Sequence, residues 1–334
     1  MTKSGKNNGL TDVEGIMVGH YTSLSAASGV TVILCKAGAV GGVDVRGSAP
    51  GTRETDLLAP VNLVEKVQGI VLCGGSVFGL SAADGVVAWL AQLGCGFPLA
   101  EGKVAPIVPS AALFDLGRGK DYVPPIRPEW GIRACESAST GSVPVGCVGA
   151  GTGAVSGTIK GGIGSASELL ASGMTVAALV AVNSLGSVIN RTTGLPWEVY
   201  LEVDGEFGSE GRRSVKLPPA TAPASPSNTT LGVVVTNAAL TKAQAQKIAQ
   251  MAHDGLARAI RPAHTMFDGD TIFCMATGEH NLKDSEGFFS VPMAEAMNEL
   301  GRAAADCMSR AIVRAVLDAH SMGKISAFRD LQSL

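Results

Sequence analysis

The chain has 334 residues, enough for one large domain or two ordinary ones, and 46% of them are apolar, so a sizeable core can form. Charged residues make up 16% and the formal net charge is −3, which argues against a nucleic-acid-binding surface, as does the lack of any Lys/Arg cluster. Glycine, at 43 residues, is about twice as frequent as usual, which indicates many tight turns or close backbone approaches.

Nothing in the chain indicates secretion or a membrane span. The first residues carry charge but no apolar core, so we expect no signal peptide, and no uninterrupted apolar run reaches about 18 residues. The seven cysteines are scattered and form no C-x-x-C pair, which is typical of reduced core thiols. We therefore expect a cytoplasmic protein without membrane contact.

Short apolar runs rich in Val and Ile predict buried strands at residues 30–35, 69–74, 174–182, 232–237 and 271–277. Helical patterns lie at 81–94, 241–260 and 291–320. Thr241 has the position of an N-cap. Strands mixed with helices, without a regular βαβ rhythm, predict helices layered over packed sheets.

Two glycine-rich stretches depart from the motifs that they resemble. Ser76 follows two glycines and precedes a predicted helix, but the G-x-S-x-G spacing of a nucleophile elbow is absent. We interpret Ser76 as a helix N-cap or a wall of the site. Residues 149–157 lack the third glycine of a dinucleotide fingerprint, so we interpret them as a loop of close backbone approach and expect no organic cofactor.

The acidic and imidazole side chains do not form a recognisable metal site. The five histidines include no HxH or HxxxH pair, and Asp268 and Asp270 around Gly269 lack the calcium spacing, so we expect no metal. Acids two residues apart in a strand point the same way and could orient an ammonium group, although such a pair is often only a turn. A Ser/His/Asp triad is not excluded, because its members need not be near in the chain, but nothing selects one.

The sharpest change of composition lies at 218–228. Residues 218–227 hold four prolines among small residues and predict a flexible linker, whereas residues 229–236 predict a rigid strand. A hydroxyl nucleophile needs a base, and the α-amine of a chain's first residue can serve, with a reference pKa of about 7.7–8.0. Attack of the Thr229 hydroxyl on the Asn228 carbonyl, followed by hydrolysis of the ester, would create such a residue. The alternative is a surface linker with Asn228 in a turn.

Several motifs resemble the L-aminopeptidase/D-esterase (DmpA-like) family, which includes β-peptidyl aminopeptidases and nylon-oligomer hydrolases. They include GAVGGVDVRGSAPGTRETDLL at 38–58, GIVLCGGSVFGLSAADGV at 69–86 and GAGTGAVSGTIKGGIGSAS at 149–167, and the resemblance covers almost the whole chain. It implies one catalytic domain, 1–334, with an α/β fold: an αββα sandwich like that of ornithine acetyltransferase, similar to N-terminal-nucleophile (Ntn) hydrolases with different connectivity. It also implies a cut into a large chain, 1–228, and a small chain, 229–334, that stay associated in a homo-oligomer, a tetramer in relatives.

The resemblance also assigns roles to residues of the site. Thr229 matches the nucleophile of the threonine branch, which includes the nylon-oligomer hydrolases, and Asp268 and Asp270 match its acidic pair. In the serine branch the first of these acids is a serine. Asn183 matches an asparagine that stabilises the oxyanion, as an amide N–H can do, although it could also be a turn residue at a strand end.

Two positions depart from the family pattern. The nylon-oligomer hydrolases carry a lysine where this chain has Thr158. Lys160, two residues further on, either fills that role through a shifted loop or is only a loop charge. Phe114 replaces a site tyrosine of several members, so a hydroxyl contact to the tetrahedral intermediate would be missing.

We therefore expect an amide hydrolase, an aminopeptidase or amidase, that acts on short peptides or amino-acid amides through an acyl-enzyme on Thr229. Phe114 and Ser76 are expected in the substrate pocket. The first alternative is an acyltransferase resembling ornithine acetyltransferase, whose front motifs do not match this chain. The second is an uncleaved binding protein without activity. The choice among α-peptides, β-peptides, D-amino-acid amides and ω-amino-acid oligomers stays open, because loops set it.

Overall fold

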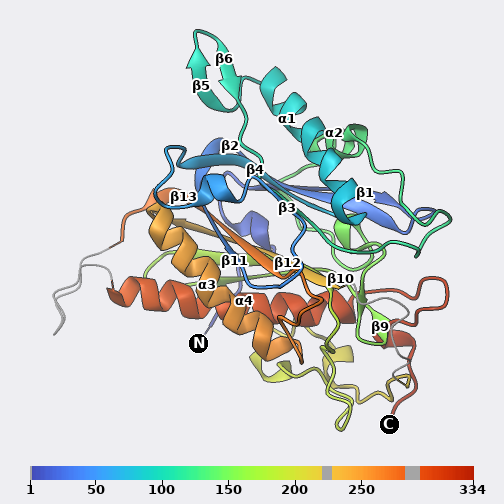
Figure 1. Ribbon diagram of the computed structural model, residues 1–334. Helices are drawn as coiled ribbons and strands as arrows, with labels where there is room; N and C mark the ends of the chain where they lie inside the picture. The colour runs from blue at the N-terminus through green and yellow to red at the C-terminus, as the bar shows by residue number, and fades with distance from the viewer. Residues whose placement is uncertain (1, 220–227, 283–293) are drawn as a thin grey trace.

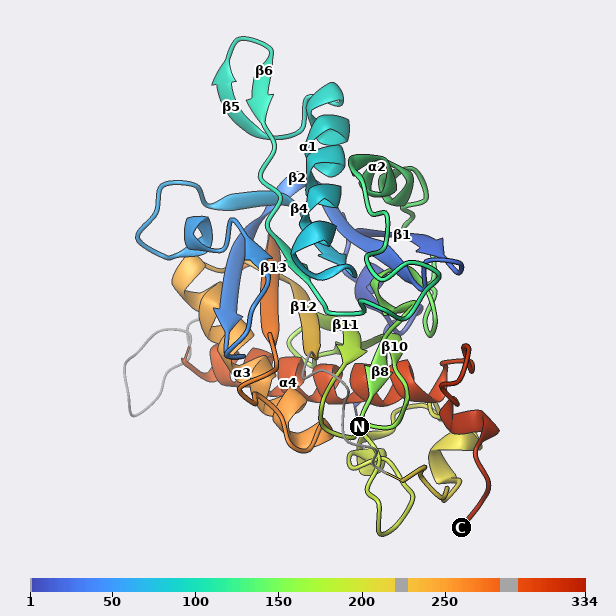
Figure 2. The same cartoon turned by 45° about the vertical axis from the view of Figure 1, so that its right-hand side comes forward.

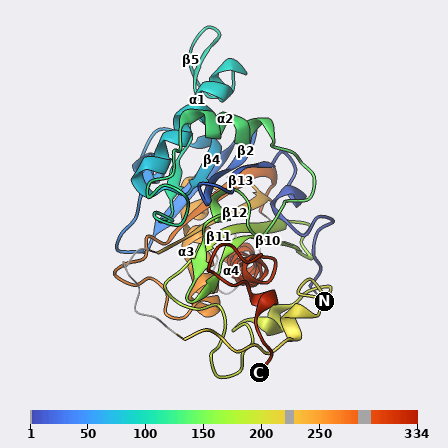
Figure 3. The same cartoon turned by 90° about the vertical axis from the view of Figure 1, so that its right-hand side faces the viewer.

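Four layers make up the fold, in the order helix, sheet, sheet, helix (Figure 1). The computed structural model describes residues 2–219, 228–282 and 294–334, so residues 220–227 of the expected linker lie outside the described residues. Helices α1 (Ala82–Gln92) and α2 (Pro128–Glu136) cover one strand layer. Helices α3 (Lys242–Ala259) and α4 (Ala294–Leu317) cover the other. This is the expected αββα sandwich, which Figure 3 shows from the side.

One long strand, β2 (Ser28–Val45), belongs to both strand layers. It pairs with β1 (Met17–Ser23) in its first half, with β4 (Lys66–Cys73) at residues 30–34 and 39–40, and with β13 (Thr271–His280) at residues 40–45. The order continues from β13 through β12 (Thr229–Ala238) and β11 (Thr175–Asn183) to β10 (Gly162–Leu169). On the other side β4 is followed by β7 (Ser110–Ala112) and β3 (Thr52–Arg53).

Two small hairpins lie outside this sheet. Strands β5 (Phe97–Ala100) and β6 (Lys103–Ala105) form an arm that extends beyond α1 (Figure 2). Strand β8 (Val155–Ser156) lies at the end of the glycine-rich stretch 149–157 that the sequence singled out, and β9 (Ile159–Lys160) follows it. These short pairs carry too few apolar residues to show a period, and the sequence did not predict them.

Strict alternation along the central strands separates the apolar side chains into different cores. In β12, Leu231, Val233 and Val235 pack between the two strand layers, whereas Val234 packs beneath α3 and α4. A third core lies between α1, α2 and the other strand layer. Because these strands are covered on both faces, they read in the sequence as continuous apolar runs, and all five predicted strands form.

The predicted helices also form, and their ends have local causes. The N-cap prediction for Thr241 is confirmed: its Oγ1 accepts from the Gln244 N–H at 3.3 Å, and Gln244 Oε1 accepts from the Thr241 N–H at 2.8 Å. The predicted helix at 291–320 is α4, whose first predicted residues, 291–293, lie outside the described residues. None of the described helices is both long and apolar enough to cross a bilayer.

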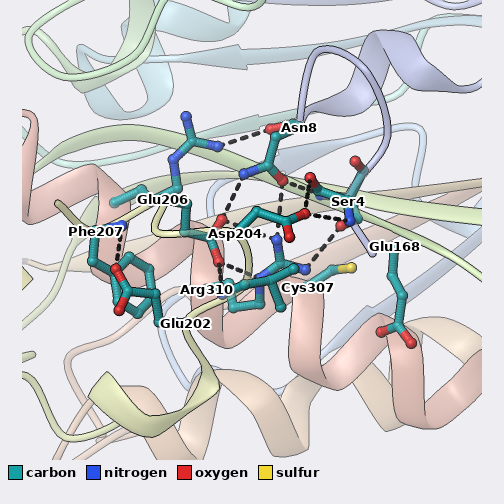
Figure 4. A network of polar contacts seen from close by, with 12 residues as sticks. Ser4, Asn8, Glu168, Glu202, Asp204, Glu206, Phe207, Cys307 and Arg310 are labelled. Atoms are coloured by element: carbon teal, nitrogen blue, oxygen red, sulfur yellow. Dashed lines mark hydrogen bonds and ion pairs between the residues drawn. The ribbon is translucent and has the colours of Figure 1, made fainter. Parts of the chain in front are cut away.

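A buried polar network fastens α4 to the N-terminal segment and to the loop around Glu206 (Figure 4). Arg310 is 1% exposed; its guanidinium binds both Glu206 oxygens at 2.5 and 2.9 Å and the Asn8 amide oxygen at 3.0 Å. It also donates to the Ser167 carbonyl at 2.8 Å. Since a buried charge without partners is costly, this network fixes the position of α4 against segments far away in the sequence.

Gly255 in α3 gives a direct test of the helix packing. A Cβ atom at this position would lie 2.0 Å from the Ala305 carbonyl oxygen of α4, so Gly255→Ala should lower the free energy of unfolding by about 2 kcal/mol. In an open helix the same change would stabilise by about 1 kcal/mol. Lys247→Ala, at an exposed position of α3, is the control and should change stability by less than about 0.5 kcal/mol. Urea denaturation of the wild type and the two variants measures the free energy of unfolding. A Gly255→Ala variant as stable as the wild type would contradict the close packing of α3 against α4.

Candidate active site

The expected site residues meet where three central strands begin or end. Strands β12 and β13 run parallel and start at the same edge of the sheet, with Leu231 opposite Thr271. Strand β11 runs antiparallel to β12 and ends there, with Asn183 opposite Thr229. The pairing therefore brings Thr229, Asn183 and the segment 268–270 together, although they are far apart in the sequence.

The bond between Asn228 and Thr229 has polar groups on both sides. Thr229 Oγ1 lies 2.5 Å from the Asn228 carbonyl oxygen, and the Gly269 N–H donates to the same oxygen at 3.2 Å. The Asn228 N–H donates to the Phe267 carbonyl at 3.5 Å. The carbonyl before Thr229 is thus held between a hydroxyl and a backbone donor, and a backbone N–H is a group that stabilises an oxyanion.

Only the first of the two neighbouring threonines is turned toward open space. Thr229 lines a cleft, whereas Thr230 is fully buried and its hydroxyl has no hydrogen-bond partner among the described residues. Successive side chains of a strand point to opposite faces, which explains the difference. The geometry therefore distinguishes Thr229 from Thr230 as the candidate nucleophile, in line with the choice made from the linker-to-strand junction and from the resemblance.

The two acids hold the backbone around Thr229. Asp270 Oδ1 accepts from the Thr230 N–H at 2.8 Å, and Oδ2 accepts from the backbone N–H of His264 at 3.1 Å and lies 2.9 Å from its Nδ1. Asp268 accepts from the Thr265 N–H at 2.9 Å and from its hydroxyl at 2.6 Å. Burial raises the pKa of Asp268 above its usual range. In the described chain neither carboxylate is hydrogen-bonded to Thr229 Oγ1, so their action on an ammonium group stays a prediction.

The sequence did not single out His264, although its ring reaches Asp270. Its backbone is in the left-handed region, with φ of 55°, which a non-glycine residue rarely adopts. Arg261–Pro262 and the Asp-Gly-Asp motif at 268–270 can be recognised in the sequence. The contact between His264 and Asp270, however, depends on the conformation of the turn between them. His264 thus belongs to the environment of the site through Asp270.

Gly269 is required for space and not for a left-handed backbone. Its φ is not among the left-handed ones. A Cβ atom there would instead lie 2.7 Å from the Ala49 carbonyl oxygen and 2.9 Å from Thr229 Oγ1. The segment 46–49 passes directly over the acids, because the Gly47 N–H donates to the Asp270 carbonyl at 3.1 Å and the Ala49 N–H to the Asp268 carbonyl at 3.0 Å.

Asn183 lies next to Thr229 with its amide already engaged. Its Nδ2 donates to the Phe114 carbonyl at 3.0 Å, and its Oδ1 accepts from the Val155 N–H at 3.1 Å and from the Arg118 guanidinium. The donors on Oδ1 fix the orientation of the amide. The role of Asn183 in stabilising an oxyanion stays a prediction. The sequence gave no signal that Arg118 would bind Asn183.

Lys160 lies in β9 and faces backbone carbonyls of the glycine-rich segment. Its ammonium is fully buried and donates to the carbonyls of Gly151, Ala154 and Gly161 at 3.2, 2.8 and 2.9 Å. Burial lowers its pKa to about 8. The described structure gives it no hydrogen bond to Thr229, so what it demonstrably does is hold the loop in shape.

A cleft of about 460 Å³ opens beside Thr229. Residues 49–52 form one wall, Ser76, Val77 and Leu80 another, and Ala112, Phe114, Asn228 and Phe267 complete it. Ser76 and Phe114 thus line the cleft, and Ser76 has a left-handed φ of 53° at the start of a 3-10 helix whose N-cap is Gly75. The wall at 49–52 belongs to the segment at 38–58. That segment carries the family resemblance, but nothing in the sequence predicted that it would line the cleft.

Metal ligands do not gather at this cleft or elsewhere in the part of the chain that the structure describes, where no three His, Cys, Asp or Glu side chains are placed to hold an ion.

Two solved structures that superpose on the chain are described as enzymes. A beta-aminopeptidase of Burkholderia sp. superposes with a TM-score of 0.71 at 25% identity, covering 96% of this chain and 89% of its own. An L-aminopeptidase D-Ala-esterase/amidase of Ochrobactrum anthropi, described as a variant of the Ntn hydrolase fold, superposes with a TM-score of 0.74 at 21% identity, covering 98% and 92%. The fold is therefore that of Ntn-type hydrolases, as expected.

The sequence comparisons narrow this to one family. The profile of peptidase family S58 matches residues 8–328. An uncharacterized aminopeptidase of Mycobacterium leprae is 46% identical, covering 96% of this chain and 93% of its own, and a 6-aminohexanoate-oligomer endohydrolase of Kocuria sp. is 30% identical, covering 91% and 84%. The chain belongs to peptidase family S58 and is an amide-bond hydrolase of the aminopeptidase and amidase class.

Gly269→Ala tests the geometry around the Asn228–Thr229 bond. The added methyl group would contact Thr229 Oγ1 and push the segment away. If the chain cuts itself at this bond, as the sequence predicts, the cut should be at least about tenfold slower. Gly141→Ala is the control, because a Cβ atom there meets Ser139 Oγ at an ordinary 3.6 Å. The measurement is the time course of the two fragments on a denaturing gel, and equal rates for both variants would show that Gly269 does not control the geometry.

Proposed function

We propose that the chain cuts itself between Asn228 and Thr229 and then hydrolyses short peptides or amides with Thr229 as its N-terminal nucleophile. The observation that carries this is the position of Thr229 Oγ1, 2.5 Å from the Asn228 carbonyl oxygen and at the wall of the cleft. The Gly269 N–H on the same carbonyl supports it.

In the first reaction Thr229 Oγ1 attacks the Asn228 carbonyl carbon. The C–N bond breaks, an ester to Oγ1 forms, and the proton of the hydroxyl passes to the released α-amine. Water then hydrolyses the ester and leaves Asn228 as a C-terminal carboxylate. The Gly269 N–H stabilises the oxyanion of this step, and Asp270 holds the Thr230 N–H so that the start of β12 stays in register.

In the second reaction the free α-amine of Thr229 takes the proton of its own hydroxyl, which attacks the substrate carbonyl. Its reference pKa of about 7.7–8.0 suits a base at neutral pH. The amine product leaves, an acyl-enzyme remains on Thr229, and water releases the acid. Asn183 is the side-chain candidate for the oxyanion, because its Nδ2 carries two N–H groups and, among the described residues, only the Phe114 carbonyl accepts from it.

The two fragments have reasons to stay together after the cut. Strand β12 of the small fragment pairs with β11 of the large one, and β13 pairs with β2. Arg310, on the small fragment, is bound to Glu206 and Asn8 on the large one. Neither set of bonds involves the peptide bond that is cut.

Acyl trapping tests the nucleophile. After incubation with p-nitrophenyl acetate, mass spectrometry should find an acetyl group on Thr229 in the small fragment. Thr230→Val, which removes the adjacent buried hydroxyl at constant shape, should retain the adduct, whereas Thr229→Ala should lack it. An adduct on another residue in the wild type, or one that persists in Thr229→Ala, would contradict the proposal.

A further inference from the structure

One loop holds the side-chain amide of Asn183 at both ends. The Phe114 carbonyl accepts from Nδ2 at 3.0 Å, and four residues further on the Arg118 guanidinium donates to Oδ1. The loop turns between them at Gly117, whose φ of 73° is left-handed and whose N–H donates to the Tyr122 carbonyl at 2.7 Å. Both contacts to the amide therefore come from one short turn of the chain.

Arg118 also shapes the second segment that binds this amide. Its Nη1 donates to the Gly153 carbonyl at 2.6 Å. Two residues further on, the Val155 N–H donates to Asn183 Oδ1 at 3.1 Å. The guanidinium thus binds Oδ1 directly and also holds the backbone that supplies the other donor to Oδ1.

The contact brings a positive charge to the amide oxygen. Of the described residues that bind the Asn183 amide, only Arg118 is charged. Burial lowers the pKa of its guanidinium, the charge of the buried Asp115 opposes this effect, and an arginine stays protonated in proteins. Because hydrogen bonds in series polarise one another, a cation on Oδ1 makes the Nδ2 N–H groups stronger donors.

These donors lie beside the nucleophile. Asn183 and Thr229 are direct partners in the pairing of β11 with β12, so their side chains are on the same face of the sheet. Nδ2 has two N–H groups, and among the described residues only the Phe114 carbonyl accepts from it, which leaves one for an oxyanion. A flipped amide would turn Nδ2 toward the guanidinium, two donors against each other, so Arg118 excludes that orientation.

We infer that Arg118 is a positioning residue of the hydrolysis, which fixes and polarises the Asn183 amide as a donor to the oxyanion. This rests on the proposed function, in which Asn183 assists Thr229. Arg118 is not among the described residues that line the cleft, so it acts through Asn183 and not on the substrate. Its loss should therefore lower kcat and leave KM nearly unchanged.

The test is a double-mutant cycle on the cut protein, with L-alanine p-nitroanilide as the probe. Arg118→Met keeps a long apolar stem without the charge and should lower kcat at least about tenfold, with KM changed less than about threefold. In an Asn183→Ala background the same change should lower kcat less than about twofold, because the group through which Arg118 acts is missing. Lys120→Met removes an exposed cation of the same loop and should leave both constants unchanged.

Chemical rescue decides the case in which a variant is barely active or is purified uncut. Tens of millimolar guanidinium chloride should raise the activity of Arg118→Ala, or its rate of self-cleavage if it is uncut, at least about threefold, since the free ion can occupy the place of the side chain. Sodium chloride at the same concentration should have no effect.

A loss of kcat that is equal in both Asn183 backgrounds, or an Arg118→Ala variant that guanidinium does not rescue, would overturn the role of Arg118 and leave the proposed function intact. A cut wild type that cleaves no anilide would instead overturn the proposed hydrolysis on Thr229, and this role with it.

Discussion

The register of β11, β12 and β13 is the constraint on which the site depends. The strands are buried on both faces, so a slip of one residue would move every apolar side chain of β12 into the wrong core. The same register places Thr229 opposite Asn183 and beside the turn that carries Asp268 and Asp270. The core that stabilises the fold therefore also fixes the geometry of the Asn228–Thr229 bond.

Close backbone approach explains why so many glycines surround this site. Gly269 leaves room for Thr229 Oγ1, and Gly47 lies so close to Asp270 that a Cβ atom there would be 2.2 Å from the Asp270 nitrogen. Backbone N–H and C=O groups of the segment 46–49 can then bind the acid turn directly. The site is thus built largely from backbone groups.

The sequence predicted the parts of the protein whose cause is local. Continuous apolar runs predicted the central strands, the N-cap position of Thr241 predicted the start of α3, and the change at residue 228 indicated the junction. Contacts that depend on the turn geometry were not predictable: His264 on Asp270, Arg118 on Asn183 and the enclosure of Lys160 by three carbonyls. The last of these shows that the partners of Lys160 depend on how the backbone around it closes, which the sequence does not determine locally.

The intact masses of the freshly purified protein and of Thr229→Ala, under denaturing conditions, test the central claim most directly. The account predicts two wild-type fragments whose masses sum to the full chain plus one water, the smaller beginning at Thr229, and a variant that stays uncut. A single uncut wild-type species, or a variant cut at the same bond, would contradict a nucleophile that the chain makes for itself.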